Sequence, residues 1–170
     1  MAVRIQHDDF DAGVESRALQ NSSVGAVALF VGTVRGKDQN ARDDTDDHTG
    51  THDVMAMTLE HYPGMTEAEI ERIEAAARDR WPLSGVTVIH RVGRLLPNDQ
   101  IVLVAAAAAH RQDAFDAAQF IMDFLKTDAP FWKAEERNGK ISWVDARDSD
   151  NSATQKWRYR RQERGSTTSE

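Results

Sequence analysis

Residues 101–126 read IVLVAAAAAHRQDAFDAAQFIMDFLK, and two periodicities meet in this stretch. The first part, residues 101–109, is continuously apolar, as in a buried strand, although the high helix propensity of alanine also allows a helix. From Arg111 onward the apolar residues recur at helical spacing and predict an amphipathic helix that ends near Lys126, before Pro130. The core stripe of this helix is expected at Ala114, Ala118, Ile121 and Leu125.

The segments on either side repeat this alternation of strand and helix. Further β-branched and apolar runs predict strands at 24–34, 54–62, 86–92 and 141–146. A helix is expected from a capping box of Thr66 with Glu69 and a hydrophobic staple of Met65 with Ile70, and Pro82 ends it. Its core stripe is expected at Ile70, Ile73, Ala77 and Trp81.

Strands and helices that interleave with hairpins, one of them turning at Pro97-Asn98-Asp99, indicate an α+β (mixed α/β) fold. We expect a single domain over residues 1–157, interrupted at 36–53 by a mobile acidic loop that is rich in Asp, Thr and Gly and almost without apolar residues. Residues 158–170 are expected to form a disordered tail.

Composition excludes several classes of function. The chain has 170 residues, a net charge of −7 and no cysteine, so disulfides, thiolate metal sites and a cysteine nucleophile are ruled out. The acidic balance argues against nucleic-acid binding, and the absence of a long apolar run argues against membrane insertion, so we expect a cytoplasmic protein. The spacing of His48 and His52 gives only a weak indication of a metal site, and neither metal nor cofactor is expected.

Two lysines flank an apolar corner in FLKTDAPFWKAEER, residues 124–137. Taken alone, Lys126 is typical of a helix C-terminus and Lys133 of a surface lysine whose stem covers apolar residues. Because Pro130 stiffens the corner and aromatic residues anchor it, the pair together favours two ammonium groups held near one apolar wall. Such lysines can donate protons, act as nucleophiles or clamp an anion.

Several other polar residues follow strands. His110 and Arg111 open the second helix, where an anion is favoured, but an ordinary polar helix start is equally plausible from the sequence. Arg35 and Arg147 each follow a predicted strand, and a simple charged strand terminus is the alternative for both. The helix separates Arg111 from Lys126 by roughly 22 Å, so one small ligand can meet both only if they come from different subunits.

Long segments of the chain resemble the family of the large, catalytic subunit of molybdopterin synthase. The resemblance is carried in order by LFVGTVRG (29–36), LEHYPGMTEAEI (59–70), RWPLSGVTVIHRVGRLLPND (80–99), AHRQDAFDAAQFIMDFLKTDAPFWK (109–133) and WVDARDSD (143–150). It implies an α/β hammerhead fold with an added small antiparallel β subdomain.

The resemblance also implies a reaction and its partners. In that family the large subunit is a homodimer within a heterotetramer, and each copy binds a small ubiquitin-like sulfur-carrier subunit that ends in a Gly-Gly thiocarboxylate. Two sulfurs pass to cyclic pyranopterin monophosphate and form the dithiolene of molybdopterin. A sulfurtransferase of this kind needs no cysteine of its own.

Site residues follow from the resemblance by position. Lys126 and Lys133 match the lysines at the carrier terminus, with Lys126 most closely tied to catalysis. The expected substrate pocket adds Thr33, Val34, Arg35, His110, Arg111, Ala134 and Glu135, and the expected supporting positions are Phe30, Met122 and Arg147.

Three alternatives keep the same residues but change the function. The first is a non-catalytic binding protein for a phosphorylated metabolite, using Arg35, His110 and Arg111. The second is a lyase that forms a Schiff base through Lys126. The third is a structural partner of the carrier alone.

Overall fold

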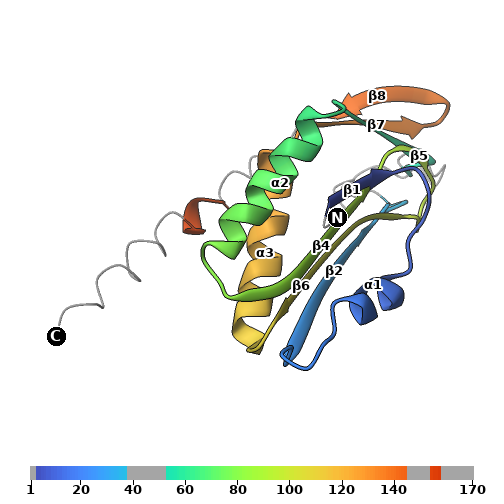
Figure 1. Ribbon diagram of the computed structural model, residues 1–170. Helices are drawn as coiled ribbons and strands as arrows, with labels where there is room; N and C mark the ends of the chain where they lie inside the picture. The colour runs from blue at the N-terminus through green and yellow to red at the C-terminus, as the bar shows by residue number, and fades with distance from the viewer. Residues whose placement is uncertain (1–2, 38–52, 145–153, 158–170) are drawn as a thin grey trace.

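The computed structural model describes residues 3–37, 53–144 and 154–157, which form two β-sheets, three helices and a single helical turn at 154–157 (Figure 1). In chain order the elements are β1 (Val3–Gln6), α1 (Ala12–Ala18), β2 (Ala26–Thr33), β3 (Ala56–His61), α2 (Met65–Arg78), β4 (Leu83–Arg91), β5 (Gly93–Leu95), β6 (Gln100–Ala108), α3 (Arg111–Thr127), β7 (Phe131–Arg137) and β8 (Lys140–Val144).

The larger layer is a four-stranded sheet in the order β1-β4-β6-β2, parallel between β1 and β4 and antiparallel elsewhere. The alanine run lies in β6, an inner strand, and Ala105 to Ala108 are completely buried. Strand neighbours on both sides satisfy the backbone of β6 and override the helix propensity of alanine. The prediction of a strand at this position is therefore confirmed, and the helical alternative is wrong.

Helices α2 and α3 cover one face of this sheet (Figure 1). The predicted stripes of both helices are confirmed, since all eight expected side chains are buried there. Trp81 follows the end of α2 at Arg78 instead of lying inside the helix, and it packs edge-on against Phe120 and Trp157 with ring centroids 5.4 and 5.7 Å away. This aromatic group closes the end of the core.

A second sheet in the order β5-β3-β7-β8 is antiparallel throughout. Four buried residues, Val34, Met57, Leu59 and Leu95, form its own small core. This sheet is the added antiparallel subdomain of the expected mixed α/β architecture, which is confirmed. Strand β7 begins directly after Pro130, so the expected apolar corner passes at once into a strand and Lys133 lies within it.

The start of α2 differs from the prediction. Gly64 is the N-cap, and its backbone N–H donates to the Glu67 carboxylate at 2.7 Å. Met65 is the first helical residue and 58% exposed, so the predicted hydrophobic staple is wrong. Thr66 is fully buried, and its hydroxyl accepts from the Tyr62 N–H and donates to the Pro130 carbonyl. It therefore ties α2 to the α3–β7 corner instead of capping the helix.

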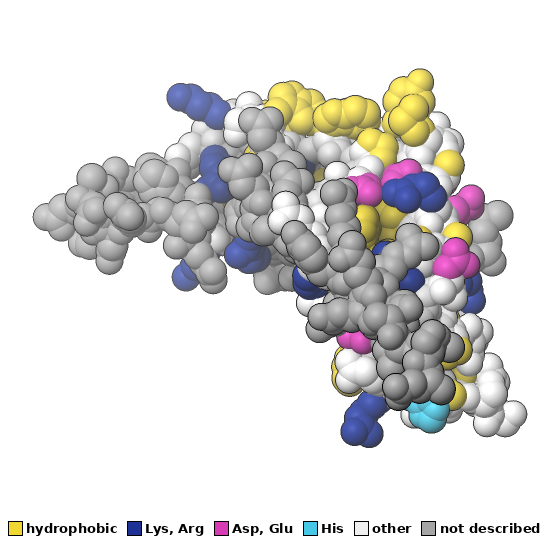
Figure 2. Space-filling view, turned by 90° about the vertical axis from the view of Figure 1, so that its left-hand side faces the viewer, with side chains coloured by type: hydrophobic (Ala, Val, Ile, Leu, Met, Phe, Trp, Pro, Cys, Tyr) yellow, Lys and Arg dark blue, Asp and Glu magenta, His cyan; other side chains and the backbone are white. Residues whose placement is uncertain are grey.

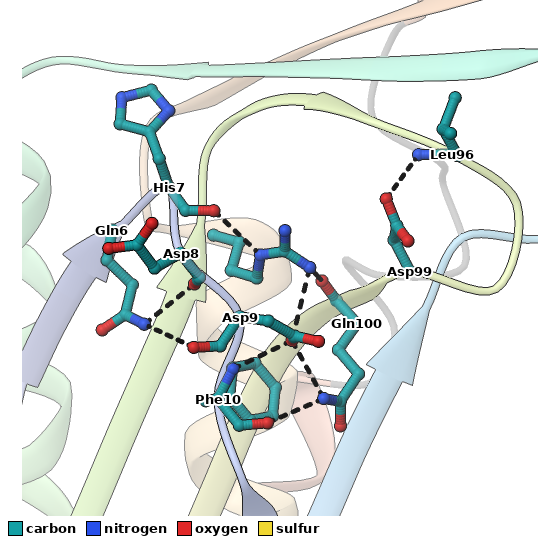
Figure 3. Close-up of polar contacts among 9 residues, drawn as sticks. Gln6, His7, Asp8, Asp9, Phe10, Leu96, Asp99 and Gln100 are labelled. Carbon is teal, nitrogen blue, oxygen red and sulfur yellow. Dashed lines mark hydrogen bonds and ion pairs between the residues drawn. The ribbon is translucent and has the colours of Figure 1, made fainter.

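The N-terminal elements β1 and α1 were not expected from the sequence. Figure 3 shows how the segment after β1 is bound to the sheet. The Arg91 guanidinium donates to the carbonyls of His7 and Gln100 at 3.1 and 3.0 Å and contacts the Asp9 carboxylate at 3.3 Å. The Gln100 amide completes the network with bonds to Asp9 and Phe10.

Two predicted segments lie wholly or mostly outside the described residues. These are the acidic loop, of which only 36, 37 and 53 are described, and the tail 158–170. The two flanks of the loop meet, since the Val54 N–H donates to the Gly36 carbonyl at 2.7 Å. Across the described parts of the chain, no helix combines the length and the apolar character needed to cross a membrane.

Candidate active site

A cleft of about 790 Å³ opens where β2, β3 and β7 meet the C-terminal half of α3. Seven of the expected site residues line it: Phe30, Thr33, Arg35, Met122, Lys126, Lys133 and Glu135. Their positions span more than a hundred residues of the chain, from Phe30 to Glu135. The cleft lies at the junction of the two sheets, so the fold itself brings them together.

Lys126 and Lys133 both line this cleft, on opposite sides of the α3–β7 corner. Lys126 is exposed in the last turn of α3, where the helix dipole favours a cation. Lys133 is half-buried on β7, and its ammonium lies 3.1 Å from the Glu135 carboxylate. One lysine is thus open to solvent and ligand, while the other is held by an acid.

The corner between the lysines is fixed from two sides. The Thr66 hydroxyl donates to the Pro130 carbonyl at 3.1 Å, and the Phe131 ring stacks on His90 with centroids 3.8 Å apart and planes 16° from parallel. Both Thr66 and His90 are buried. The corner therefore has little freedom to move the lysines apart.

Glu135 is the one carboxylate among the described residues that line the cleft, and it binds cations on both sides. Arg137 donates to its second oxygen at 2.7 Å while Lys133 contacts the first. Burial acts to raise the pKa of Glu135, but the bonds from Arg137 and Lys133 outweigh it, and the pKa is lowered. Glu135 is therefore ionised at neutral pH and holds the ammonium group of Lys133 in position.

Arg35 is held at the mouth of the cleft by the backbone next to it. Val34 donates its N–H to the Asp99 carbonyl and accepts from the Asn98 N–H, both at 2.9 Å. The predicted turn at 97–99 is thereby confirmed, and it docks against the end of β2. Arg35 itself is exposed and has room to meet a ligand.

His90 is a cleft residue that the sequence analysis missed. Its Nδ1 lies 2.9 Å from the Arg91 carbonyl, so the neutral ring donates there and carries its lone pair on Nε2. Burial lowers the pKa of His90 to about 4, and the ring is neutral at physiological pH. A polar residue within the apolar strand VTVIHRV was the available signal.

Two cationic lining residues, Lys37 and Arg137, were also missed. With Arg35, Lys126 and Lys133, they bring the cationic side chains of the lining to five, against the one carboxylate of Glu135. The whole chain carries a net charge of −7. The cleft is therefore positively charged although the whole chain is negatively charged, and it favours an anionic ligand.

Not all expected site residues reach this cleft. The side chains of Val34 and Ala134 are buried, 2% and 3% exposed, and their backbones are engaged by the 97–99 turn and by β3 and β8. His110 and Arg111 lie at the opposite end of α3 and are exposed. Arg147 lies outside the described residues. The roles expected for these five residues stay predictions.

Among the described residues, no three His, Asp or Glu side chains gather in a way that could hold a metal ion. His48 and His52 lie outside the described residues. The groups of the cleft can bind an anion, stabilise developing negative charge and donate protons.

Comparison with known proteins decides the family. The family model described as MoaE protein matches residues 5–128. The chain belongs to the MoaE protein family. It is 50% identical over 157 residues to the molybdopterin synthase catalytic subunit of Ralstonia nicotianae, covering 91% of this chain and 83% of that protein.

Two further relatives extend this similarity over nearly whole chains. The molybdopterin synthase catalytic subunit of Pseudomonas aeruginosa is 48% identical over 159 residues, which cover 92% of this chain and 99% of that protein. The molybdopterin biosynthesis MoaE protein from Burkholderia ambifaria has a solved structure that matches with a TM-score of 0.74 at 50% identity, covering 92% of this chain and 97% of that one.

Proposed function

We propose that this chain is the catalytic subunit of a molybdopterin synthase. It transfers two sulfur atoms to cyclic pyranopterin monophosphate, each from the thiocarboxylated C-terminus of a small ubiquitin-like carrier subunit, which is left as a carboxylate. The observation that carries the proposal is the cleft with five cationic side chains and an exposed Lys126, in a chain that has no cysteine. Both the thiocarboxylate and the cyclic phosphate are anions.

Each side chain of the cleft has a role that follows from its position. Lys126 is exposed and faces the acyl group of the carrier tail, where an ammonium stabilises the charge that develops when the acyl–sulfur bond is cleaved. Lys133, oriented by Glu135, is the second contact to this terminus. Arg35 at the mouth offers a bidentate fork to the phosphate. The apolar wall of Phe30 and Met122 excludes water beside the extended tail.

The proposal includes an assembly of two copies of this chain with two carriers, because His110 and Arg111 lie too far from Lys126 to serve the same cleft of one chain. It also includes a cytoplasmic location, which the composition supports: 29% of the residues are charged, as is typical of a chain that folds in water.

The experiment supplies the chain with thiocarboxylated carrier and cyclic pyranopterin monophosphate and identifies the product by mass spectrometry. Lys126→Ala should lower the rate by about a hundredfold or more, as loss of a charge-stabilising group does, and Lys133→Ala should be impaired less. Lys140→Ala removes an exposed lysine of β8 outside the cleft lining and should match the unmodified protein.

The same experiment separates the proposal from a non-catalytic binding protein. If the unmodified chain binds the cyclic phosphate but forms no dithiolene with a competent carrier, the binding alternative is correct. Near-normal turnover by Lys126→Ala would remove the catalytic role of that lysine. Lys126→Ala should remain folded, because an exposed lysine at a helix end contributes only about 0.3–1 kcal/mol to stability.

A further inference from the structure

We propose that Nε2 of His90 accepts a hydrogen bond from the backbone N–H of the terminal glycine of the carrier. His90 lies on β4 of the larger sheet and lines the cleft. The inference rests on the proposed function, because that function supplies the Gly-Gly tail. The two lysines then bind the carboxyl end of the tail, and His90 fixes the amide that precedes it.

The ring of His90 is held in one orientation. Strand β4 is an inner strand, in which His90 pairs with Ile5 of β1 and with Val102 of β6. The ring donates from Nδ1 to the Arg91 carbonyl at 2.9 Å, and Phe131 covers one of its faces at 3.8 Å between centroids. The residue is only 9% exposed. None of the described residues bonds to Nε2, so this nitrogen is the polar atom that the ring offers to a ligand.

The cleft is rich in hydrogen-bond donors and poor in acceptors. Its five cationic side chains can only donate. The oxygens of Glu135 already bind Arg137 and Lys133, and the Thr33 hydroxyl belongs to an exposed residue. Lys and Arg side chains are also scattered over the outer surface (Figure 2), so charge alone does not define the ligand. The buried lone pair of His90 adds a requirement, because it stays unpaired unless a ligand N–H or O–H meets it.

The position of His90 relative to the lysines identifies this donor. Phe131, on which His90 stacks, lies two residues before Lys133, and their side chains share one face of β7. Two strand residues span roughly 6.6 Å. Lys126 reaches the same cleft from the other side of the corner. In a terminal glycine the amide nitrogen lies only roughly 2.5 Å from the carboxyl carbon, so a tail bound between the lysines brings this N–H beside the His90 ring.

An exchange of amide for ester in the carrier tests this bond. Binding of the unreactive carboxylate form is measured by titration calorimetry, with glycine or with glycolate as the last residue of the carrier. The glycolate carrier lacks the N–H and should bind the unmodified chain about tenfold more weakly. His90→Phe keeps an aromatic ring against Phe131 but lacks the acceptor, so the two carriers should differ by less than about twofold.

Thr33→Val is the matched control, because it removes the other neutral acceptor of the described lining and should keep the full effect of the ester. Equal ester effects in His90→Phe and the unmodified chain overturn the inference. So does a glycolate carrier that binds the unmodified chain as tightly as the glycine carrier, a result that needs no variant to fold.

Two further outcomes separate this inference from its alternatives. If His90→Phe binds cyclic pyranopterin monophosphate more weakly but keeps the ester effect, the donor belongs to the pterin and the inference is overturned. An unmodified chain that binds neither carrier contradicts the proposed function and the inference together. Sulfur transfer without any ester effect leaves the proposed function in place and removes only the bond to His90.

Discussion

Three residues of the cleft lining, Lys133, Glu135 and Arg137, come from a single strand, in which side chains alternate between the two faces. They alternate along β7 and therefore share the face of the strand that turns toward the cleft. The carboxylate between the two cations binds both, at 3.1 and 2.7 Å. The intervening Ala134 and Glu136 face away from the cleft, which explains why Ala134 is adjacent in sequence but does not line it.

His90 should make the folding stability of the protein depend on pH. Its pKa falls from 6.5 to about 4 on folding, so below pH 6.5 the unfolded chain takes up a proton that the folded chain does not. Folding stability should therefore decrease as the pH falls through this window. The contribution of His90 is about 2 kcal/mol between about pH 7.5 and about pH 5.

Urea unfolding at these two pH values measures this contribution. His90→Gln cannot titrate, so its loss of stability over the same interval should be smaller by about 2 kcal/mol than that of the unmodified protein. The lost ring stacking lowers stability equally at both pH values and cancels in the difference. Equal pH-dependence of the two proteins would show that His90 takes up its proton normally in the folded state.

At the scale of elements, Arg91 joins the N-terminal segment to the sheet. Arg91→Ala leaves the His7 and Gln100 carbonyls without this donor and should destabilise the protein by about 1–3 kcal/mol. Hydrogen exchange in β1 and α1 should accelerate most. Arg94→Ala is the matched control, since that exposed guanidinium pairs with Glu136 at the surface and the loss of this pair should cost at most about 1 kcal/mol. Similar effects of both variants would contradict the structural role of Arg91.

The acidic segment between β2 and β3 should be dispensable for folding. Its flanks are already joined by the bond from the Val54 N–H to the Gly36 carbonyl. Replacing residues 38–52 by a short turn should change the melting temperature by only a few degrees, because loop-closure entropy varies slowly with length. Thermal unfolding followed by circular dichroism measures this, and a large fall would show that the segment contributes packing.

At the scale of the whole molecule, the two ends of α3 should complement each other between subunits. Arg111→Ala and Lys126→Ala should each be inactive alone. After subunit exchange, half the dimers are mixed and each mixed dimer has one intact cleft, so about a quarter of the activity should return. Sulfur transfer to the cyclic phosphate is the readout.

A matched mixture provides the control for this complementation. Arg111→Ala mixed with His110→Ala places both defects at the same end of α3, so every cleft of a mixed dimer carries one of them and no activity should return. If exchange is demonstrated by mass and the first mixture is no more active than its components, the cleft is built from a single chain.

The sequence by itself determined the elements whose periodicity is long and regular. The stripe Ala114 to Leu125 predicted α3 almost to the residue, and Pro130 its end, because amphipathic spacing and the missing proline N–H are local properties. The sequence also predicted two lysines beside one apolar corner, since the helix end, the proline and the aromatic residues between them are adjacent in the chain, and both lysines line the cleft.

The tertiary structure alone decided what depends on distant partners. The alanine run became a strand because β4 and β2 pair with it, and Thr66 became a bridge to Pro130 because α2 packs beside the corner. His90 entered the cleft because burial and the Phe131 ring hold it there. Secondary-structure propensity reflects the local preference of a residue. These positions were set by backbone pairing and burial against residues that are distant in the sequence.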